Sequence, residues 1–389
     1  MTPLANRSTL CAAALAIFLS VAPAAAIDVI AFGDSLTFGV GDEEGLGYPK
    51  RLKKMLGKGS SVLNFGEPAE ETVIGVSRIR TVLGEEADVL LLMEGTNDVT
   101  RIAQASLSIE TTLANLDTMI TRTRDADIEP VLSSVIPRAP EAKVDHTNFV
   151  TELLVGELRE LAVARNVRFT DAFDLFDPER VPAFFDDFYD QDPDDNIGHL
   201  SGAGYEKLAA AYFDLLNEVD SAPPVIGNFE PGPLPNQVRA NSRFTVPVYD
   251  FRGGAGLDLE QTRLLINGTV LAEGTTSEGD ERKVVLTHKG QRTIGCRVVL
   301  QVQAQDRAEP PNVLDKIVDI YDVVDRTILP GDVDFDCQVD GADLVSFALR
   351  FGLDSTDPRY LLTWDFNRDG LIDETDLDTL SSNFGKASR

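Results

Sequence analysis

Four positions in the first half of the chain combine residue types that could act together in nucleophilic catalysis. Ser35 and Asn97 each stand two residues beyond a glycine that follows an apolar run, Gly66 closes another apolar run, and His199 precedes a helix-like stretch. The carboxyl ends of parallel strands meet at one edge of a sheet, where open α/β sheets bind ligands. The placement of these four residues therefore predicts one site at such an edge.

The chemistry that this set supports is acyl transfer through a covalent intermediate. A serine hydroxyl becomes an effective nucleophile when a neighbouring imidazole accepts its proton, and His199 offers that imidazole to Ser35. The tetrahedral intermediate carries an oxyanion, and removing one N–H donor aimed at it typically costs roughly 3–4 kcal/mol. Gly66 suits a donor position because a residue without Cβ lets a substrate approach the backbone closely.

The Gly-Asp-Ser-Leu motif around Ser35 and the Gly-Thr-Asn-Asp motif around Asn97, together with Gly66 and His199 in their order along the chain, resemble those of the SGNH hydrolases, also called the GDSL lipase/acylhydrolase family. The resemblance covers residues 27–218. It implies that Ser35 is the nucleophile and His199 the catalytic histidine. It also implies that the Ser35 and Gly66 backbone N–H groups and the Asn97 side chain form the oxyanion hole.

The residue that orients the histidine departs from the family pattern. The family's aspartate stands three residues before the histidine, and Asn196 occupies that position here, with Asp195 one residue earlier in an acidic run. Three partners for His199 are therefore open: Asp195 after a local shift, Asn196 facing a neutral ring, or a backbone carbonyl. We favour Asp195, because an uncharged partner would not stabilise the imidazolium that forms during the reaction.

Strand-like and helix-like segments alternate through residues 27–220 and predict an α/β fold. Apolar runs predict strands at 28–32, 61–65, 87–93, 130–136 and 167–170. Apolar residues at helical spacing predict helices at 47–57, 70–84, 109–124, 149–165 and 202–218. The alternation implies a parallel sheet with helices on both faces, which together with the family resemblance predicts a three-layer α/β/α, flavodoxin-like hydrolase domain.

The segments on either side of this domain have different patterns. Residues 1–26 have the charge, the short apolar stretch and the small-residue cleavage site of a secretory signal peptide. We therefore expect a secreted, extracellular protein with no integral membrane span. Residues 221–328 contain short β runs with turn signals about every ten residues, among them Asn267-Gly268, and predict an immunoglobulin-like β-sandwich.

The tail, residues 329–389, contains a 33-residue repeat, and each copy opens with a calcium-loop pattern. Ca²⁺ takes about six to eight oxygen ligands, which alternating side chains and a backbone carbonyl on a tight loop supply. The expected ligands are Asp332, Asp334, Asp336, Gln338, Asp340 and Asp343 in the first loop, and Asp365, Asn367, Asp369, Leu371, Asp373 and Asp376 in the second. Gly370 allows the sharp turn of the second loop, and Cys337 at the matching position should weaken the first.

An aspartate at the last loop position, and one helix after each loop, resemble a dockerin domain rather than paired EF-hands. The resemblance implies a small α domain with two structural Ca²⁺ sites and a cohesin-type scaffold protein as a partner. The loops lack the Ser-Thr pair common in one dockerin class, so the type of cohesin stays open. Dockerins attach polysaccharide-degrading enzymes to scaffolds, and the tail therefore favours a carbohydrate ester as the substrate.

Composition limits the remaining choices. The net charge of −29 argues against a nucleic-acid-binding protein. After removal of the signal peptide the chain keeps Cys296 and Cys337, which allow one disulfide or two free thiols. His288 and Trp364 are expected to be packing or surface residues. The proposed catalytic chemistry needs no cofactor.

The leading hypothesis is a secreted serine esterase that hydrolyses acyl esters, O-acetyl groups on polysaccharides above all. One alternative is an acylhydrolase of lipids or short-chain esters, or a thioesterase. Another is a non-catalytic, carbohydrate-associated scaffold component, which only the presence of Asn196 at the family's aspartate position supports. The acyl chain length and the alcohol part of the ester do not follow from these residues.

Overall fold

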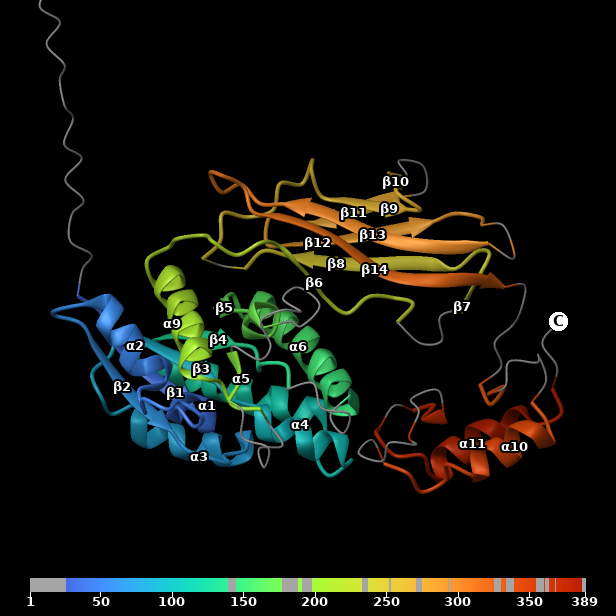
Figure 1. Cartoon of the computed structure of the whole chain (residues 1–389), viewed down its shortest axis with the longest axis horizontal. Coiled ribbons are helices and arrows are strands. Elements are labelled where there is room, and N and C mark those ends of the chain that lie inside the picture. The colour runs from blue at the N-terminus through green and yellow to red at the C-terminus, as the bar shows by residue number, and fades with distance from the viewer. Residues whose placement is uncertain are drawn as a thin grey trace, which may run out of the picture.

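The computed structural model describes residues 26–138, 145–176, 188–190, 198–232, 237–251, 253–270, 275–292, 294, 296–324, 330–333, 339–354, 360, 364–367 and 369–386. Figure 1 shows an N-terminal α/β domain in blue to green, a β-sandwich in yellow to orange, and a small helical tail in red.

The N-terminal domain is built on one parallel sheet with the strand order β2-β1-β3-β4-β5. The strands are β1 (Asp28–Gly33), β2 (Ser61–Gly66), β3 (Val89–Met93), β4 (Glu129–Ser133) and β5 (Arg168–Thr170). This order is that of doubly wound, flavodoxin-type sheets, in which ligands bind at the carboxyl edge where the winding reverses. The predicted α/β fold with a parallel sheet is confirmed.

Helices cover both faces of this sheet because successive strand residues point to opposite sides. Ile30 and Phe32 of β1 belong to one apolar core, and Val29 and Ala31 belong to the other. The first core is closed by α3 (Thr72–Val82), α4 (Thr96–Ala103), α5 (Ile109–Asp125) and α6 (Asp145–Arg165), and the second by α2 (Gly47–Leu56) and α9 (Gly202–Leu216). The predicted helices correspond to α2, α3, α5, α6 and α9, whereas α4 and the single-turn helices α1 (Ser35–Phe38) and α7 (Ala172–Leu175) were not predicted.

The second domain consists of two sheets that enclose one apolar core. One sheet has the order β10-β9-β13-β14-β7 and the other β11-β12-β8-β6. Their strands are β6 (Val225–Ile226), β7 (Gln237–Arg239), β8 (Arg243–Tyr249), β9 (Arg263–Ile266), β10 (Thr269–Val270), β11 (Thr275–Gly279), β12 (Lys283–Lys289), β13 (Arg297–Gln305) and β14 (Val313–Val324). Asn267 and Gly268 have φ angles of 52° and 74° and join β9 to β10, as the hairpin signal predicted. The immunoglobulin-like topology stays a prediction.

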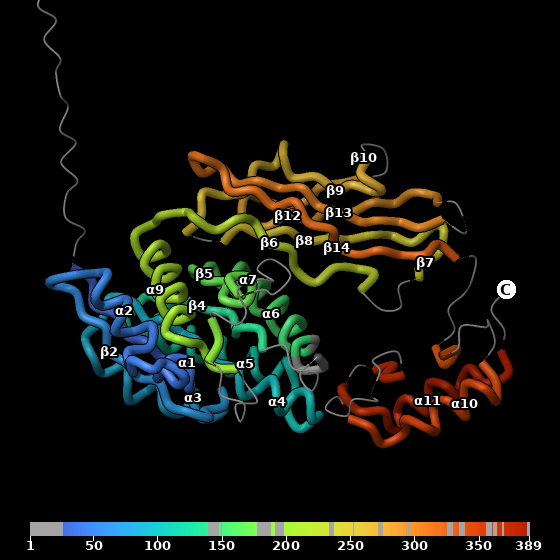
Figure 2. The backbone as a smooth tube through the Cα atoms, in the orientation of Figure 1, coloured from blue at the N-terminus to red at the C-terminus, as the bar shows by residue number. Residues whose placement is uncertain are grey.

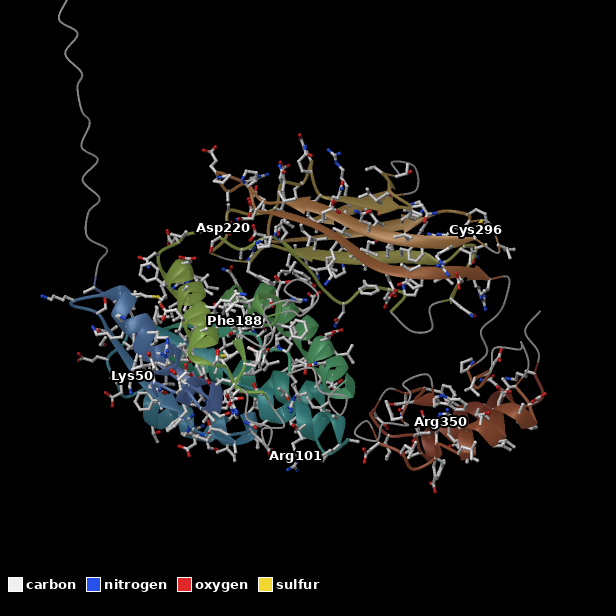
Figure 3. All side chains as sticks on the ribbon, in the orientation of Figure 1. Lys50, Arg101, Phe188, Asp220, Cys296 and Arg350 are labelled. Atoms are coloured by element: carbon white, nitrogen blue, oxygen red, sulfur yellow. The ribbon has the colours of Figure 1, made fainter. Side chains whose placement is uncertain are left out.

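The sandwich packs directly against the α/β domain through α6. The Glu160 carboxylate accepts hydrogen bonds from Tyr249 Oη at 2.5 Å and from Lys283 Nζ at 2.6 Å. Arg159 donates to the Ile226 carbonyl oxygen at 2.6 Å. Asp220, labelled in Figure 3, lies where the two domains meet. These polar contacts join the two domains side by side.

The tail carries α10 (Gly341–Ala348) and α11 (Glu374–Asn383) around a small apolar core of its own, and Trp364 belongs to that core. Figure 2 shows α10 and α11 close together in the red part of the tube. His288 is also buried, as expected for a packing residue, whereas Cys296 is exposed and has a free thiol; Cys337 lies outside the described residues. None of the helices in the described part of the chain combines the length and apolar character that a bilayer span needs.

Candidate active site

The carboxyl edge of the parallel sheet brings three of the predicted site residues to one place. Gly33 at the end of β1 lies directly opposite Gly66 at the end of β2. Ser35 follows as the first residue of α1, and Asn97 follows β3 as the second residue of α4. The strand order therefore places the three sequence motifs on neighbouring strand ends.

The His199 side chain lies within hydrogen-bond distance of Ser35. Its Nε2 lies 2.8 Å from Ser35 Oγ although 164 positions separate the two residues in the sequence. Both side chains are nearly buried, with 4% of Ser35 and 9% of His199 exposed. A hydrogen bond of this length lets the imidazole accept the hydroxyl proton, which is the first requirement of serine catalysis.

The turn after β1 fixes the serine. Asp34 caps α1, and its carboxylate accepts the Leu36 backbone N–H at 2.9 Å. Gly39 ends α1 with a φ angle of 101°, a conformation that favours glycine. Burial raises the pKa of Asp34 from 3.8 to about 6, and the Leu36 hydrogen bond only partly opposes this effect. The serine thus sits on a single helical turn closed at both ends.

The histidine is held by the backbone around it. The His199 carbonyl accepts the Asp190 N–H at 2.8 Å. A Cβ placed on Gly41 would lie 2.8 Å from His199 Cβ, so only glycine allows this approach. Tyr205 of α9 donates its hydroxyl to the Val40 carbonyl at 2.6 Å and fixes α9 against the segment after α1. Asp195 and Asn196 lie outside the described residues, so the group that orients His199 stays a prediction.

The two remaining oxyanion-hole candidates already have hydrogen-bond partners. The Gly66 N–H donates to Asn64 Oδ1 at 2.8 Å, so a substrate oxygen must replace this acceptor or share the N–H with it. Asn97 Nδ2 donates one N–H to the Glu70 backbone carbonyl at 2.8 Å. This bond fixes the plane of the amide, and the second N–H on the same nitrogen is the candidate donor to an oxyanion.

The predicted reason for a glycine at position 66 is wrong. A Cβ on Gly66 would lie 2.0 Å from Phe38 N and 2.5 Å from Phe38 Cα. The space that the missing side chain leaves is therefore filled by the end of α1 rather than by substrate. Gly66 allows α1, which carries Ser35, to pack against the end of β2.

Asp98, the last residue of the Gly-Thr-Asn-Asp motif, has a structural part in the site. Its buried carboxylate accepts the Thr72 N–H at 2.9 Å, the Thr72 hydroxyl at 2.5 Å and the Thr112 hydroxyl at 2.9 Å. These bonds hold the segment before α3, where Glu70 lies, against α4.

Several residues beneath the site were missed by sequence reasoning: Asn64, Glu70, Arg78 and Glu94. Glu94 is fully buried between β3 and the Asn97 motif, and a carboxylate at the end of an apolar run was a usable signal. Burial, with Asp34 and Glu70 nearby, raises its pKa well above the usual range. Arg78 gave no signal, because it stands in an ordinary helical pattern.

In the tail, carboxylates of both predicted calcium loops are buried. Asp332 and Asp343 of the first loop are 6% and 0% exposed, and Asp365 and Asp376 of the second are 1% and 0% exposed. Gly370 has a φ angle of 87°, as a sharp turn requires. Asp340 and Asp373 cap α10 and α11, whereas Asn367, Asp369 and Leu371 lie in the second loop. Asp334, Asp336 and Gln338 lie outside the described residues.

Comparison with known proteins identifies the first domain. Residues 31–207 match the model of the GDSL-like Lipase/Acylhydrolase family. The matched segment covers the α/β domain, which is less than half of the whole chain. Because the members of this family hydrolyse carboxylic esters, the chain is a serine ester hydrolase.

The solved structures that are similar to this protein match about half of the length of this chain. A lipase/acylhydrolase from Enterococcus faecalis is 25% identical, with 48% of this chain and 93% of that chain covered and a TM-score of 0.41. A member of the lipolytic protein G-D-S-L family from Veillonella parvula DSM 2008 is 17% identical, with 49% and 99% covered and a TM-score of 0.42. An acetylxylan esterase from Geobacillus stearothermophilus is 18% identical, with 48% and 92% covered and a TM-score of 0.39. No curated protein sequence matches the chain.

Proposed function

We propose that this GDSL-like hydrolase is a secreted esterase that removes acyl groups from carbohydrates, with O-acetyl groups on polysaccharides as the leading substrates. The observation that carries the chemistry is the 2.8 Å contact between Ser35 Oγ and His199 Nε2 at the carboxyl edge of the sheet. The calcium-loop tail and the signal-peptide pattern of residues 1–26 support the substrate class and the extracellular location.

The reaction follows the usual two steps of serine hydrolases. Ser35 Oγ attacks the ester carbonyl carbon while His199 Nε2 takes the hydroxyl proton. The imidazolium then protonates the leaving alkoxide, and the alcohol departs from an acyl-enzyme on Ser35. In the second step His199 deprotonates a water molecule, which attacks the acyl carbonyl carbon. The imidazolium then returns the proton to Ser35 Oγ as the bond between Ser35 and the acyl group breaks and the acid leaves.

The oxyanion of each tetrahedral intermediate would be stabilised by three donors. These are the backbone N–H groups of Ser35 and Gly66 and the Asn97 Nδ2–H that does not bind Glu70. The Gly66 N–H becomes available when the substrate oxygen takes the place of Asn64 Oδ1. Donors fixed before the reaction are effective because they need no reorganisation as charge develops.

The residues of the tail fit Ca²⁺. In the second loop Asp365 accepts only neutral donors among the described residues, namely the Tyr360 hydroxyl and the Gly370 and Asp369 N–H groups. Neutral donors do not cancel the charge of a buried carboxylate, which a hard cation would do. The twelve predicted ligands, Asp332 to Asp343 and Asp365 to Asp376, would hold two ions that stabilise the tail. A cohesin-type scaffold protein is the proposed partner of the folded tail.

The nucleophile is tested by Ser35→Ala. We expect the variant to keep its thermal unfolding midpoint, because it loses one hydroxyl, and to lose roughly 10⁴–10⁶-fold in kcat. Labelling with a fluorophosphonate probe should disappear with the activity. Residual turnover within tenfold of the unsubstituted enzyme would contradict the nucleophile assignment.

The substrate class needs a separate measurement. The rate of acetate release from acetylated xylan and pectin should be compared with the hydrolysis of p-nitrophenyl acetate, butyrate and octanoate. We expect acetyl esters to be preferred over longer chains, and the polysaccharide to be deacetylated. Fast cleavage of octanoate with no acetate release from the polymers would contradict the carbohydrate proposal.

A lipid or short-chain acylhydrolase is the second candidate, and one observation favours it. Phe38 ends the helical turn that begins at Ser35, and 56% of its side chain is exposed. An exposed aromatic ring at this place could contact an acyl chain as well as a sugar ring. The octanoate arm of the substrate panel separates the two functions.

A further inference from the structure

Arg78 of α3 lies directly beneath the carboxyl edge of the sheet. Its guanidinium contacts the Glu70 carboxylate through Nε at 2.7 Å and through Nη2 at 2.5 Å. The same group stacks over the Phe32 ring, with Cζ 4.0 Å from the ring centroid. The Arg78 side chain is 22% exposed and the Glu70 side chain 1%, so solvent does not replace this ion pair.

The remaining N–H groups of Arg78 reach the backbone next to two of the three oxyanion-hole candidates. Nη2 donates to the Gly33 carbonyl at 3.2 Å, two residues before Ser35. Nη1 donates to the Phe65 carbonyl at 3.0 Å, one residue before Gly66. One planar group therefore links the ends of β1 and β2.

The third candidate is linked through Glu70. Asn97 Nδ2 donates to the Glu70 backbone carbonyl, and the side chain of that same Glu70 is held by Arg78. The orientation of the Asn97 amide thus depends on where Glu70 lies, and the position of Glu70 depends on Arg78.

We propose that Arg78, through its ion pair with Glu70 and its bonds to two strand-end carbonyls, is the positioning residue of the oxyanion hole. It does not touch the substrate. It fixes the relative places of the Ser35 turn, the Gly66 N–H and the Asn97 amide, which come from three different strand ends. The proposal rests on the roles proposed above for these three residues.

The surrounding charges agree with this role. Glu94 Oε1 lies 4.0 Å from Arg78 Nη2 and would compete with Glu70 for the guanidinium if it were ionised. Burial, with Asp34 and Glu70 nearby, raises the pKa of Glu94 well above its usual range and favours its neutral form. Glu94 therefore does not displace Glu70 from its ion pair with Arg78.

The geometry requires an arginine rather than any cation. A guanidinium carries five donors in one plane, so it can bind a carboxylate and two carbonyls while stacking on Phe32. A lysine keeps the charge but has one nitrogen, which cannot reach Glu70, Gly33 and Phe65 in this arrangement. Arg78→Lys therefore separates the effect of charge from the effect of positioning.

The test is a double-mutant cycle on the full-length enzyme with p-nitrophenyl acetate. We expect Arg78→Gln to lower kcat by roughly 10–100-fold, because a small misplacement of catalytic groups has effects of this size, while KM changes less than about threefold. Arg78→Lys should lower kcat with little loss of thermal stability. In the Asn97→Ala background the Arg78→Gln substitution should cost less in kcat than it does alone, because one of the three groups that Arg78 positions is already missing.

Arg159→Gln is the matched control. Arg159 also makes a buried ion pair, with Asp171 at 2.8 Å, and donates to a backbone carbonyl, but at the junction with the sandwich. It should lower the unfolding midpoint and leave kcat within about twofold.

Three outcomes would overturn the proposal. The first is that Arg78→Gln and Arg78→Lys both fold and keep the kcat of the unsubstituted enzyme, while Asn97→Ala lowers kcat. The second is a double variant in which the two losses multiply fully. The third is an Asn97→Ala variant with full kcat, which would refute the proposed oxyanion hole itself and the Arg78 role with it. If Arg78→Gln fails to fold, the kcat of Arg78→Lys decides.

Discussion

The hydrolase domain and the tail both bury carboxylates, but they balance the charge in different ways. Beneath Ser35, Glu70 is paired with Arg78, and Asp98 accepts hydrogen bonds from hydroxyl and N–H donors. Burial raises the pKa of Asp34 to about 6 and that of Glu94 well above its usual range, which favours their neutral forms. In the hydrolase domain the charge of these buried carboxyl groups is therefore balanced by an arginine, by hydrogen-bond donors or by protonation.

The second predicted calcium loop lacks such compensation among the described residues. Asp365 and Asp376 accept backbone N–H groups and one tyrosine hydroxyl. Burial raises the pKa of both, and the neighbouring Asp369 raises it further. Buried carboxylates can therefore occur in two settings. In one, other groups of the fold neutralise or hydrogen-bond them, and in the other, we expect a bound cation to neutralise them.

The largest expected effect concerns the partner of His199. If Asp195 orients the imidazole, Asp195→Ala should lower kcat by roughly 10²–10⁴-fold, because a charged partner stabilises the imidazolium. Asn196→Ala should cost far less. Steady-state kinetics of the two variants decide between them. The opposite order would assign the role to Asn196, and no loss in either would indicate a backbone carbonyl.

Removal of calcium should affect the tail and leave the hydrolase domain unchanged. We expect EDTA to unfold the tail, with loss of its helical circular dichroism, because binding at 100–1,000 times Kd contributes about 3–4 kcal/mol to the folded state. Esterase activity should stay unchanged in EDTA. Calorimetric titration should find two sites, the weaker in the loop with Cys337. A tail that is equally helical with and without Ca²⁺ would contradict the dockerin-like interpretation.

A smaller effect is expected from Asp34→Asn. The folded-state pKa of about 6 lies above the ordinary 3.8, so the contribution of Asp34 to stability is fully present below pH 4 and is lost as the pH rises through 6. The asparagine keeps the cap but not the charge. Relative to the unsubstituted enzyme, its free energy of unfolding should be unchanged near pH 4 and higher by about 1–3 kcal/mol at pH 7.5. Urea unfolding at the two pH values, with calcium present, measures this.

Asp42→Asn is the control with the opposite sign. Burial opposes ionisation of Asp42, but the Arg51 guanidinium and the N–H groups of Glu44 and Gly47 hold its pKa below the usual range. Its contribution is therefore present above pH 4 and is lost as the pH falls. The asparagine variant should be destabilised at pH 7.5. Equal behaviour of the two variants would show that the pH dependence has another origin.

Much of the hydrolase fold could be predicted from local patterns. The five strands are apolar runs that end in glycine or polar residues, and the long helices have clear apolar periodicity, so both were found within a few residues. The helix α4 was missed because it begins inside the Asn97 motif, whose Gly-Thr-Asn-Asp sequence favours a turn. The strand β14 has no clear alternation in the sequence, because exposed and buried apolar residues, such as Ile317 and Tyr321, mix along it around a register shift opposite Leu300 and Gln301.

The site residues that could be predicted are those whose side-chain type and place in a motif indicate a chemical role. Ser35, Asn97 and His199 were found because their side chains follow strand ends or precede a helix in a recognisable order. Arg78 and Asn64 were not, since their roles come from what the strand order places beside them. Only the structure brings Arg78, 45 positions after Gly33, beneath the end of β1.

The junction between hydrolase and sandwich affects how the chain can be divided. Arg159 is buried and donates to Ile226, beyond the last residue of the catalytic domain, and the ring of Phe169 packs against Phe251 at 4.5 Å between centroids. A fragment cut after residue 220 would lose the carbonyl partner of Arg159 and expose an aromatic ring to water. The shortest piece of this chain that can do the chemistry is therefore shorter than the shortest piece that should express as a stable protein.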